Sequence, residues 1–548
     1  MAVPRTAPLV AKVDWDLDGS YTEDYDDVSS DLWHGQNIVV ERGLDMARAL
    51  ARPIVPLATS KLRNQEGRYS TEFSGSPLRG LLKPGRPIYL AQSYGDGDVA
   101  MDDADVAMDD PDVIMGGLEE IRTFTGITDE LAEEPGRFFR RVGLRALGLT
   151  ATLKGVAVTI NYQAAITTGA AAVLVFQALG LTSDQYVVDS DVITNGRQLL
   201  HWYVYRRDAW TVLEELWATE GPPATLYEDT MGRPVFEGRN YFTLNARCQT
   251  VQHEFADLSV NRAEGLMDDD DVAMDDPLMA MDGTTSIDHY KELTYEPGYK
   301  YIINDATIEV EQRAALPLAV VWAYSGSIVL AASETVVIFA KVSNPVSSIT
   351  TPVVTTDYTT TSALASVSVT EIGGTTIALT LTATGSGATV SGPAGGTGIQ
   401  IRAVAVALVG TIDAEPTLDT TFSQSEFGVR TLPSNLPIWR TMTPAVASGL
   451  ADAYLLHYRD PRPVVSITLQ NTTGQLLGQM LTREIGDRIH IVDQNGFSGV
   501  DLDVQIRTIT HTYIGEWLQR VKFGCEKIVE QDWGLWDVAE WDVDLWGQ

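Results

Sequence analysis

Cysteine is almost absent from this chain, because only Cys248 and Cys525 occur among its 548 residues. Two cysteines so far apart in the sequence exclude a disulfide framework and a thiolate zinc cluster. Basic residues are also scarce, since 39 Lys and Arg stand against 74 Asp and Glu and give a formal net charge of -35. Phosphate binding requires a surplus of Lys and Arg, so no sequence-specific nucleic-acid partner is expected.

Long apolar runs are missing as well. The most apolar stretch, 327–342, is interrupted by Glu334 and Lys341 and is shorter than the roughly 20 residues that span a bilayer. The N-terminal residues lack the apolar core of a secretory signal. We therefore expect neither membrane insertion nor export.

The motifs of common active sites do not occur. The sequence has no GxxxxGK[ST] phosphate loop, no HExxH zinc helix and no GxSxG nucleophile turn. His253 and Glu254 are followed by Phe-Ala-Asp, so the second histidine of a zinc helix is missing. We predict that the chain is not an enzyme, and we assign no catalytic and no cofactor-binding residue.

The chain has ample material for several buried cores, with 44% hydrophobic residues over a length of several domains. Short β-type runs with turn-rich connections predict a multi-domain, mainly β protein with an α+β middle domain. The expected divisions are a β domain at 1–150, an α+β domain at 151–306, a Thr- and Val-rich β-sandwich at 307–435, a helix and β domain at 436–530, and a tail at 531–548.

Two helices are well marked. Asp208 is an N-cap and Gly221-Pro222-Pro223 a stop, which predicts a helix between them whose Glu214, Glu215 and Glu220 form a solvated face. Thr443 followed by Pro444 predicts a second helix that runs to about Arg459. Strands are expected at 464–470, 488–492, 502–510 and 517–523.

Two acidic segments repeat the sequence DVAMDD, at 95–117 with a period of seven residues and again at 266–283. A seven-residue period is typical of a coiled coil, but Asp, Pro and Gly disfavour a helix and the apolar residues are contiguous. Paired surface loops or short hairpins are the favoured interpretation. Because the two segments are so similar, we expect them to lie close together.

Asp14, Asp16 and Asp18 precede Gly19 and match the DxDxDG start of a calcium loop, in which alternate oxygens face one cation. The twelfth position holds Tyr25 where a bidentate Glu is needed, and Glu23 and Asp26 are imperfect substitutes. An Asp-rich turn between two strands is the alternative. We expect the three carboxylates to converge in either case, and Ca²⁺ is the one candidate cofactor, because all the candidate ligands are hard oxygens.

The C-terminal tail, 532–548, alternates tryptophan with acidic residues. Its tryptophans fit neither a strand nor a helix face and are too exposed by composition to form a core. We therefore expect an extended segment whose indoles contact another protomer or a neighbouring protein, with interface residues Trp533, Trp536, Trp541 and Trp546.

Several segments together resemble the minor tail proteins of siphophages, the tail-associated proteins that form the baseplate hub at the tail tip. The segments are DWDLDGSY at 14–21, RNQEGRYS at 63–70, SPLRGLLKPG at 76–85, Phe124-Thr-Gly126, DAWTVLEELWATEG at 208–221, YEDTMGRPVF at 227–236, INDATIEV at 303–310, FGVR at 427–430 and IGDRIHI at 485–491. The resemblance covers most of the chain in order, apart from the acidic repeats. The Trp-rich tail also departs from the family.

The resemblance implies hub-like β-barrel domains with the β-sandwich as an insertion. It further implies a structural, homotrimeric protein of the virion that closes the tail tube and connects it to host-recognition parts. Its partners would be distal tail and tail tube proteins, the tape measure protein and receptor-binding proteins, and it would be made in the cytoplasm of a bacterial host.

Two other functions stay open from the sequence. The sandwich at 307–435 is of a kind that often recognises sugars, so an adhesion or glycan-binding tail protein is the second hypothesis. A cell-wall hydrolase is the third, since many carboxylates are present, although none is singled out as an acid and base pair.

Overall fold

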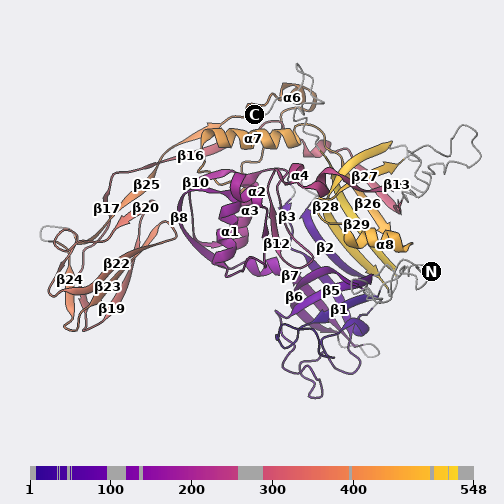
Figure 1. Cartoon of the computed structure of the whole chain (residues 1–548), viewed down its shortest axis with the longest axis horizontal. Helices are drawn as coiled ribbons and strands as arrows, with labels where there is room; N and C mark the ends of the chain where they lie inside the picture. Colours follow the sequence, from indigo (N-terminus) through magenta and orange to yellow (C-terminus); the bar gives the residue numbers. More distant parts are fainter. Residues whose placement is uncertain are drawn as a thin grey trace, which may run out of the picture.

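The computed structural model describes residues 8–33, 35, 37–45, 50, 52–94, 119–134, 140–256, 288–393, 398–493, 499–515 and 518–528. The predicted fold class is confirmed, because several sheets dominate the chain and helices gather in its middle part. Figure 1 shows the strands of both ends of the chain on one side, the helices in the centre and a strand-rich arm on the other side. The acidic repeats at 95–117 and 266–283 and the four tail tryptophans lie outside the described residues.

The N-terminal strands form a barrel. They are β1 (Leu9–Val13), β2 (Ile38–Asp45), β3 (Arg52–Pro53), β4 (Leu57–Arg63), β5 (Pro87–Tyr94), β6 (Glu119–Glu134) and β7 (Arg141–Gly148), with the short helix η1 (Ser29–Asp31). Residues 26–33 close the barrel, because the Val13 amide donates to the Asp26 carbonyl (2.9 Å) and the Trp33 amide to the Lys61 carbonyl (2.7 Å). The loop between β4 and β5 contributes Tyr69 and Leu78 to the core inside it.

A second barrel is built from the C-terminal strands and three strands from earlier in the chain. They are β13 (Val251–Ala256), β14 (Asp288–His289), β15 (Glu292–Glu296), β26 (Val464–Gln470), β27 (Arg488–Asp493), β28 (Val500–Ile514) and β29 (Leu518–Lys527), with helix α8 (Gly474–Thr482) packed on them. Two consecutive residues close it, because the Tyr290 amide donates to the Ala256 carbonyl (3.2 Å) and the Lys291 amide to the Thr468 carbonyl (2.7 Å).

This barrel corrects the expected division at residue 306. The sequence placed β13, β14 and β15 in the middle domain, whereas β13 pairs in parallel with β27 and β15 pairs with β26. The parallel partners Val251 and Arg488 are far apart in the chain. A local hydrophobic pattern shows that a strand exists but not which distant strand it pairs with, so the division could not be derived from it.

The two barrels share one continuous 14-stranded sheet through the antiparallel pair β2 and β28, with Ile38 opposite Tyr513 and Gly43 opposite Thr508. Gly43 has a φ of 114°, and a Cβ at this position would lie 2.3 Å from the Arg507 carbonyl oxygen. A glycine is therefore needed at this position of the strand pair.

The middle part is α+β. It contains η2 (Leu149–Leu153), β8 (Ala157–Thr167), α1 (Thr168–Ala178), β9 (Val187–Val188), α2 (Ser190–Asn195), β10 (Gln198–Asp208), α3 (Ala209–Glu220), β11 (Thr225–Glu228), β12 (Pro234–Glu237), α4 (Tyr241–Leu244) and α5 (Ala246–Gln249). The helix predicted from Asp208 is confirmed, since the Asp208 side chain accepts a hydrogen bond from the Thr211 amide (2.8 Å).

The solvated face expected for α3 is wrong for Glu220, which is 1% exposed. The Glu220 carboxylate accepts hydrogen bonds from the Arg197 amide (2.9 Å), the Thr168 hydroxyl (2.5 Å) and the Arg239 guanidinium (2.7 Å). A helical projection predicts that a glutamate in this position is exposed. It is buried because other segments of the chain pack over the last turn of α3 and supply these three hydrogen-bond donors.

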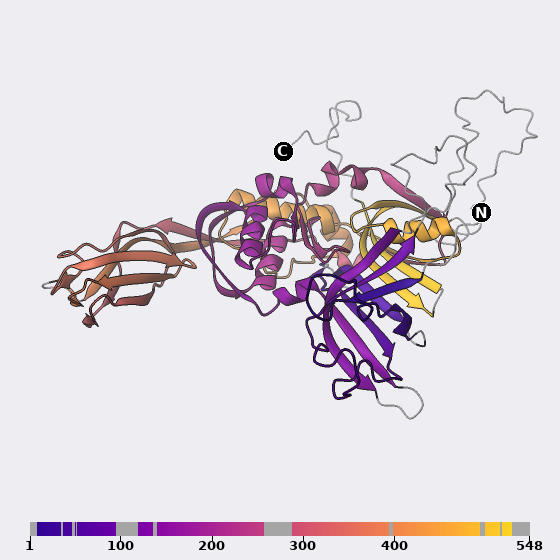
Figure 2. The same ribbon diagram turned by 60° about the horizontal axis from the view of Figure 1, so that its bottom comes forward.

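The arm is a β-sandwich carried on a two-stranded stem. Its strands are β16 (Ile308–Ala315), β17 (Ala319–Tyr324), β18 (Ile328–Leu330), β19 (Thr335–Lys341), β20 (Val346–Thr350), β21 (Thr359–Thr360), β22 (Leu364–Ile372), β23 (Thr376–Ala383), β24 (Ala388–Ser391) and β25 (Ile399–Ala414). β16 pairs with the end of β25 as the stem, and both views show the sandwich projecting away from the barrels (Figures 1 and 2).

The chain after β25 packs on the body and not in the sandwich. Helices α6 (Thr421–Phe427) and α7 (Pro444–Tyr458) lie in this region, and α7 confirms the helix predicted from Thr443 and Pro444. The short helix η3 (Tyr299–Tyr301) precedes the arm. Thr431 forms a β-bridge with Asp305, which brings the two ends of the arm together. The sandwich strands therefore end before the expected limit of 435.

Within the described residues, no helix combines the length and the hydropathy that crossing a bilayer requires.

Candidate functional site

The three aspartates predicted as calcium ligands lie together in the loop after β1. One carboxylate oxygen from each of Asp14, Asp16 and Asp18 lies within 4.8 Å of the others. Asp14 is buried, whereas Asp16 and Asp18 are exposed. This spacing is compatible with oxygen ligands at 2.3 to 2.6 Å from one Ca²⁺ ion.

The same carboxylates also hold the loop by themselves. Asp14 accepts from the Leu17 amide (2.6 Å) and the Gly19 amide (3.1 Å), and Asp18 accepts from the Ser20 amide (2.7 Å). The Tyr25 hydroxyl donates to Asp16 (2.9 Å), which lowers the pKa of Asp16 and raises the pKa of Tyr25 to about 12. These bonds belong to the Asp-rich turn, so calcium binding stays a prediction.

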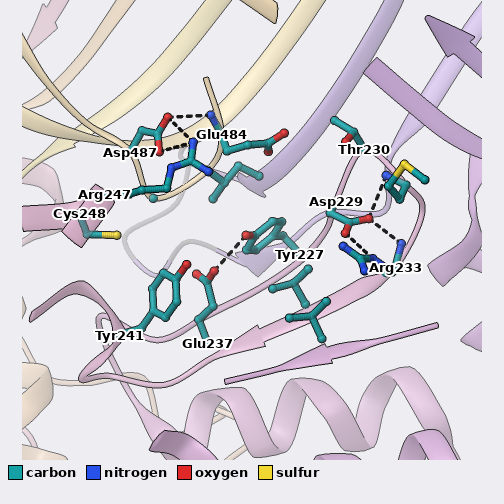
Figure 3. A pocket seen from close by; sticks show the side chains of 15 residues that line it. Tyr227, Asp229, Thr230, Arg233, Glu237, Tyr241, Arg247, Cys248, Glu484 and Asp487 are labelled. Atoms are coloured by element: carbon teal, nitrogen blue, oxygen red, sulfur yellow. Dashed lines mark hydrogen bonds and ion pairs between the residues drawn. The ribbon is translucent and has the colours of Figure 1, made fainter. Parts of the chain in front are cut away.

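A polar pocket with a volume of about 270 Å³ lies between the middle part and the C-terminal barrel. Its walls come from the hairpin β11 to β12, from α4 and α5, and from the turn at 484–487 before β27. Figure 3 shows Tyr227 near its middle, with Glu237 and Tyr241 to one side and Asp229 with Arg233 to the other. Two segments of the family resemblance, 227–236 and 485–491, therefore meet at this pocket.

Three of the pocket's carboxylates are paired with arginines. Asp229 binds Arg233 (2.8 Å), and Asp487 binds Arg247 (2.8 Å). Glu484 binds Arg42 of strand β2 (2.5 Å), so the pocket also connects to the N-terminal barrel. Each of these acids is neutralised in place by a cation.

Glu237, at the end of β12, is paired differently. It is 3% exposed and accepts hydrogen bonds from the hydroxyls of Thr225 (2.7 Å) and Tyr227 (3.0 Å). Burial raises the pKa of Glu237 to about 7, although these hydroxyls favour the ionised form. The carboxyl group can therefore gain or lose a proton near neutral pH.

A second buried carboxyl, Glu228, lies at the other end of the same hairpin. It accepts from the amides of Leu149 and Thr150, both at 2.8 Å, and thereby fixes helix η2. Burial raises the pKa of Glu228 to about 8 in spite of these donors. Because both bonds hold η2 against the hairpin, we assign Glu228 a structural role.

Sequence reasoning did not find the pocket. Its groups come from residues around 230, 245 and 485, and the hydrophobic pattern of each segment predicts only a strand, a turn or a helix. The one available signal was that segments 227–236 and 485–491 both belonged to the resemblance. Nothing in either segment indicated that they would be neighbours.

No protein-family model matches the chain, and no curated protein sequence matches it. Among solved structures, it is similar to a tail protein from Neisseria meningitidis MC58, with 9% identity, a TM-score of 0.45, and 95% of this chain and 96% of that chain covered. It is also similar to the 43 kDa tail protein of prophage MuSo2 from Shewanella oneidensis, with 12% identity, a TM-score of 0.40, and 94% and 98% covered.

A third similar structure is an Escherichia coli component of the type VI secretion system, described as similar to the tail proteins gp27 and gp5 of bacteriophage T4. The identity is 7%, the TM-score is 0.35, and 91% of this chain and 74% of that chain are covered.

Proposed function

We propose that this chain is a structural component of a bacteriophage tail tip, in which it forms a homotrimeric hub that closes the tail tube. The observation that carries the proposal is the pair of closed barrels joined by β2 and β28 in one continuous sheet. The two barrels of one chain would form two neighbouring segments of the wall of a ring, held in a fixed relative position by the shared sheet. Three chains would then set six barrels around a common lumen.

The charge of the chain suits this role. A chain with a formal net charge of -35 repels the phosphates of DNA, and phosphate binding would need a surplus of Lys and Arg that this chain lacks. DNA passing through the lumen would not be retained. The partners of the hub in this proposal are the tail tube, distal tail and tape measure proteins, with receptor-binding proteins further out.

Co-sedimentation with tail tubes tests the proposal. The full chain should pellet with assembled tubes of its own phage and should remain in the supernatant with tubes of an unrelated phage. If the purified chain never associates with its own tubes or with other tail proteins, the hub proposal is wrong.

A glycan-binding role of the arm is the second candidate, because Trp322 and Tyr324 of β17 stack with ring centroids 6.1 Å apart and Tyr324 is exposed. Exposed aromatic faces stack on sugar rings. Binding of host cell-wall glycans to the chain should then be lost in Tyr324→Ala and kept in Phe339→Ala, which removes another exposed ring of the arm. Equal binding by both variants would contradict this candidate.

A further inference from the structure

The pocket at the β11 to β12 hairpin contains a buried carboxyl group, Glu237, that forms no ion pair with the part of the chain that the structure describes. The three other carboxylates that line it are paired with Arg233, Arg247 and Arg42. Among the described residues, the hydrogen bonds that Glu237 accepts come from hydroxyl groups, those of Thr225 and Tyr227. Arg507 acts on Glu237 from a distance, but it is engaged with Glu526 at 3.3 Å.

The pocket is open to solvent and has room for a ligand. Its volume of about 270 Å³ is several times the roughly 30 Å³ that a water molecule occupies in the liquid. The side chains of Arg247 and Arg233 at its rim are 50% and 42% exposed, so a group from outside can enter between them. Glu237 and the ring of Tyr241 line the interior (Figure 3).

The lining matches an alkyl chain that ends in a cation. Val187, Val235 and Ile485 supply apolar wall, and the Tyr227 and Tyr241 rings supply π-faces and hydroxyl oxygens. Lysine and arginine side chains bury their apolar stems while the charged head binds carboxylates and aromatic faces. An anion would meet Glu237 and would find Arg233 and Arg247 already paired, so the lining disfavours it.

We propose that this pocket binds a basic side chain, arginine in the first place, presented by a neighbouring protein chain, with Glu237 as its counter-ion. A guanidinium has five donors in a planar fork that suits a carboxylate, and the surrounding hydroxyl oxygens can accept the remaining hydrogen bonds. The strongly negative charge of the chain attracts a basic partner to it. This site is distinct from the Asp14 loop.

The proposal predicts that binding is linked to a proton. Because the pKa of Glu237 is about 7, an arginine that requires the carboxylate form must displace a proton at lower pH. Binding should therefore tighten roughly tenfold between about pH 6 and about pH 8, as the carboxylate fraction rises. Binding of one arginine should release close to one proton at about pH 6 and almost none at about pH 8.

Isothermal titration calorimetry of the full chain tests this with the peptide acetyl-Gly-Arg-Gly-amide, in two buffers that differ in ionisation enthalpy. The matched control is the same peptide with citrulline, which is isosteric with arginine and neutral. The arginine peptide should bind with the pH dependence above, and the citrulline peptide should not. If the folded protein fails to bind the arginine peptide, or binds both peptides equally, the proposal is wrong.

Glu237→Gln is the decisive variant. It keeps the size of the side chain, and the hydroxyls of Thr225 and Tyr227 can donate or accept, so the hairpin should remain folded. This variant should lose at least tenfold in affinity and all proton release, whereas Glu426→Gln, on the exposed side of α6, should bind as the wild type does. Unchanged binding by Glu237→Gln would overturn the proposal.

A final experiment distinguishes binding of a protein side chain from binding of a free small cation. Propylguanidinium carries the arginine head without a peptide backbone. The proposal predicts that it binds at the same site and competes with the arginine peptide. If propylguanidinium binds and the peptide does not, the pocket takes a free cation and the assignment to a protein side chain is wrong. Each of these experiments uses the isolated full chain, so the result does not depend on assembly into a tail.

Discussion

At the scale of single residues, two buried carboxyl groups should control how stability depends on pH. The pKa values of Glu237 and Glu228 are raised to about 7 and about 8, above the ordinary glutamate value of 4.5 that holds in the unfolded chain. At pH values between about 4.5 and about 8, these two groups bind more protons in the folded state than in the unfolded state. These two groups therefore favour folding at low pH, and their contribution is lost as the pH rises from about 4.5 to about 8.

Glu237→Gln tests this dependence. The amide cannot ionise, so the variant should gain stability over the wild type at pH 8, on the order of 3 kcal/mol for a fully buried group whose pKa moves from 4.5 to about 7. The difference should vanish near pH 4, below the pKa of the unfolded chain. Thermal unfolding of both proteins across this range measures it, and parallel curves would contradict the assignment.

The Asp14 loop gives a second residue-level prediction. Asp14 is 2% exposed and accepts from two loop amides, so Asp14→Ala should cost about 1 to 3 kcal/mol by removing two hydrogen bonds of about 0.5 to 1.5 kcal/mol each. Asp14→Asn keeps one acceptor oxygen and should cost less. Chemical denaturation of the three proteins gives these values, and equal stabilities would contradict the role of Asp14.

The calcium prediction is tested in the same loop. Ca²⁺ should raise the unfolding temperature of the wild type and should have a weaker effect on Asp16→Asn, which removes a charged candidate ligand from the exposed rim of the loop. An unfolding temperature that does not respond to Ca²⁺, or responds equally in both proteins, leaves the Asp-rich turn as the explanation.

At the scale of elements, the cap of α3 should be worth a measurable part of the stability. Burial disfavours the Asp208 carboxylate, but hydrogen bonds from Thr211 and Gly155 hold its pKa below the ordinary value. Asp208→Ala should therefore cost about 0.5 to 2 kcal/mol, and Asp208→Asn clearly less. The lowered pKa means that the folded state stabilises the carboxylate form of Asp208. The cost of Asp208→Ala should therefore fall in acid, where Asp208 becomes protonated.

Thermal unfolding of Asp208→Ala and Asp208→Asn at pH 7 and at pH 3 measures both the cost and its pH dependence. A loss that is the same in the two variants would contradict the capping role.

The elements also show how far the sequence could predict the structure. Asp208, Gly221, Thr443 and Pro444 act locally, so the helices they delimit were predicted correctly. The pairing of β2 with β28 depends on residues almost the whole chain apart, and no local pattern carries it. The burial of Glu220 depends on Arg197, Arg239 and Thr168, and the pocket depends on three separate segments.

At the scale of the whole molecule, the C-terminal tail offers a test of assembly. Its four tryptophans lie outside the described residues, and the prediction that they contact another protomer or a neighbouring tail protein rests on their composition. Deleting residues 532–548 should leave the unfolding transition of the domains unchanged and should weaken assembly. Assembly of the truncated chain at the same concentration as the full chain would contradict this prediction.

The central claim is that three copies of this chain form a closed ring through their paired barrels. The most direct measurement is the mass of the purified assembly by native mass spectrometry, with class averages of the same sample by electron microscopy. A homotrimeric hub has three times the 59.7 kDa mass of one chain and appears as a three-fold ring with three projecting arms. A monomer at all accessible concentrations, or an assembly whose symmetry is not three-fold, would contradict it.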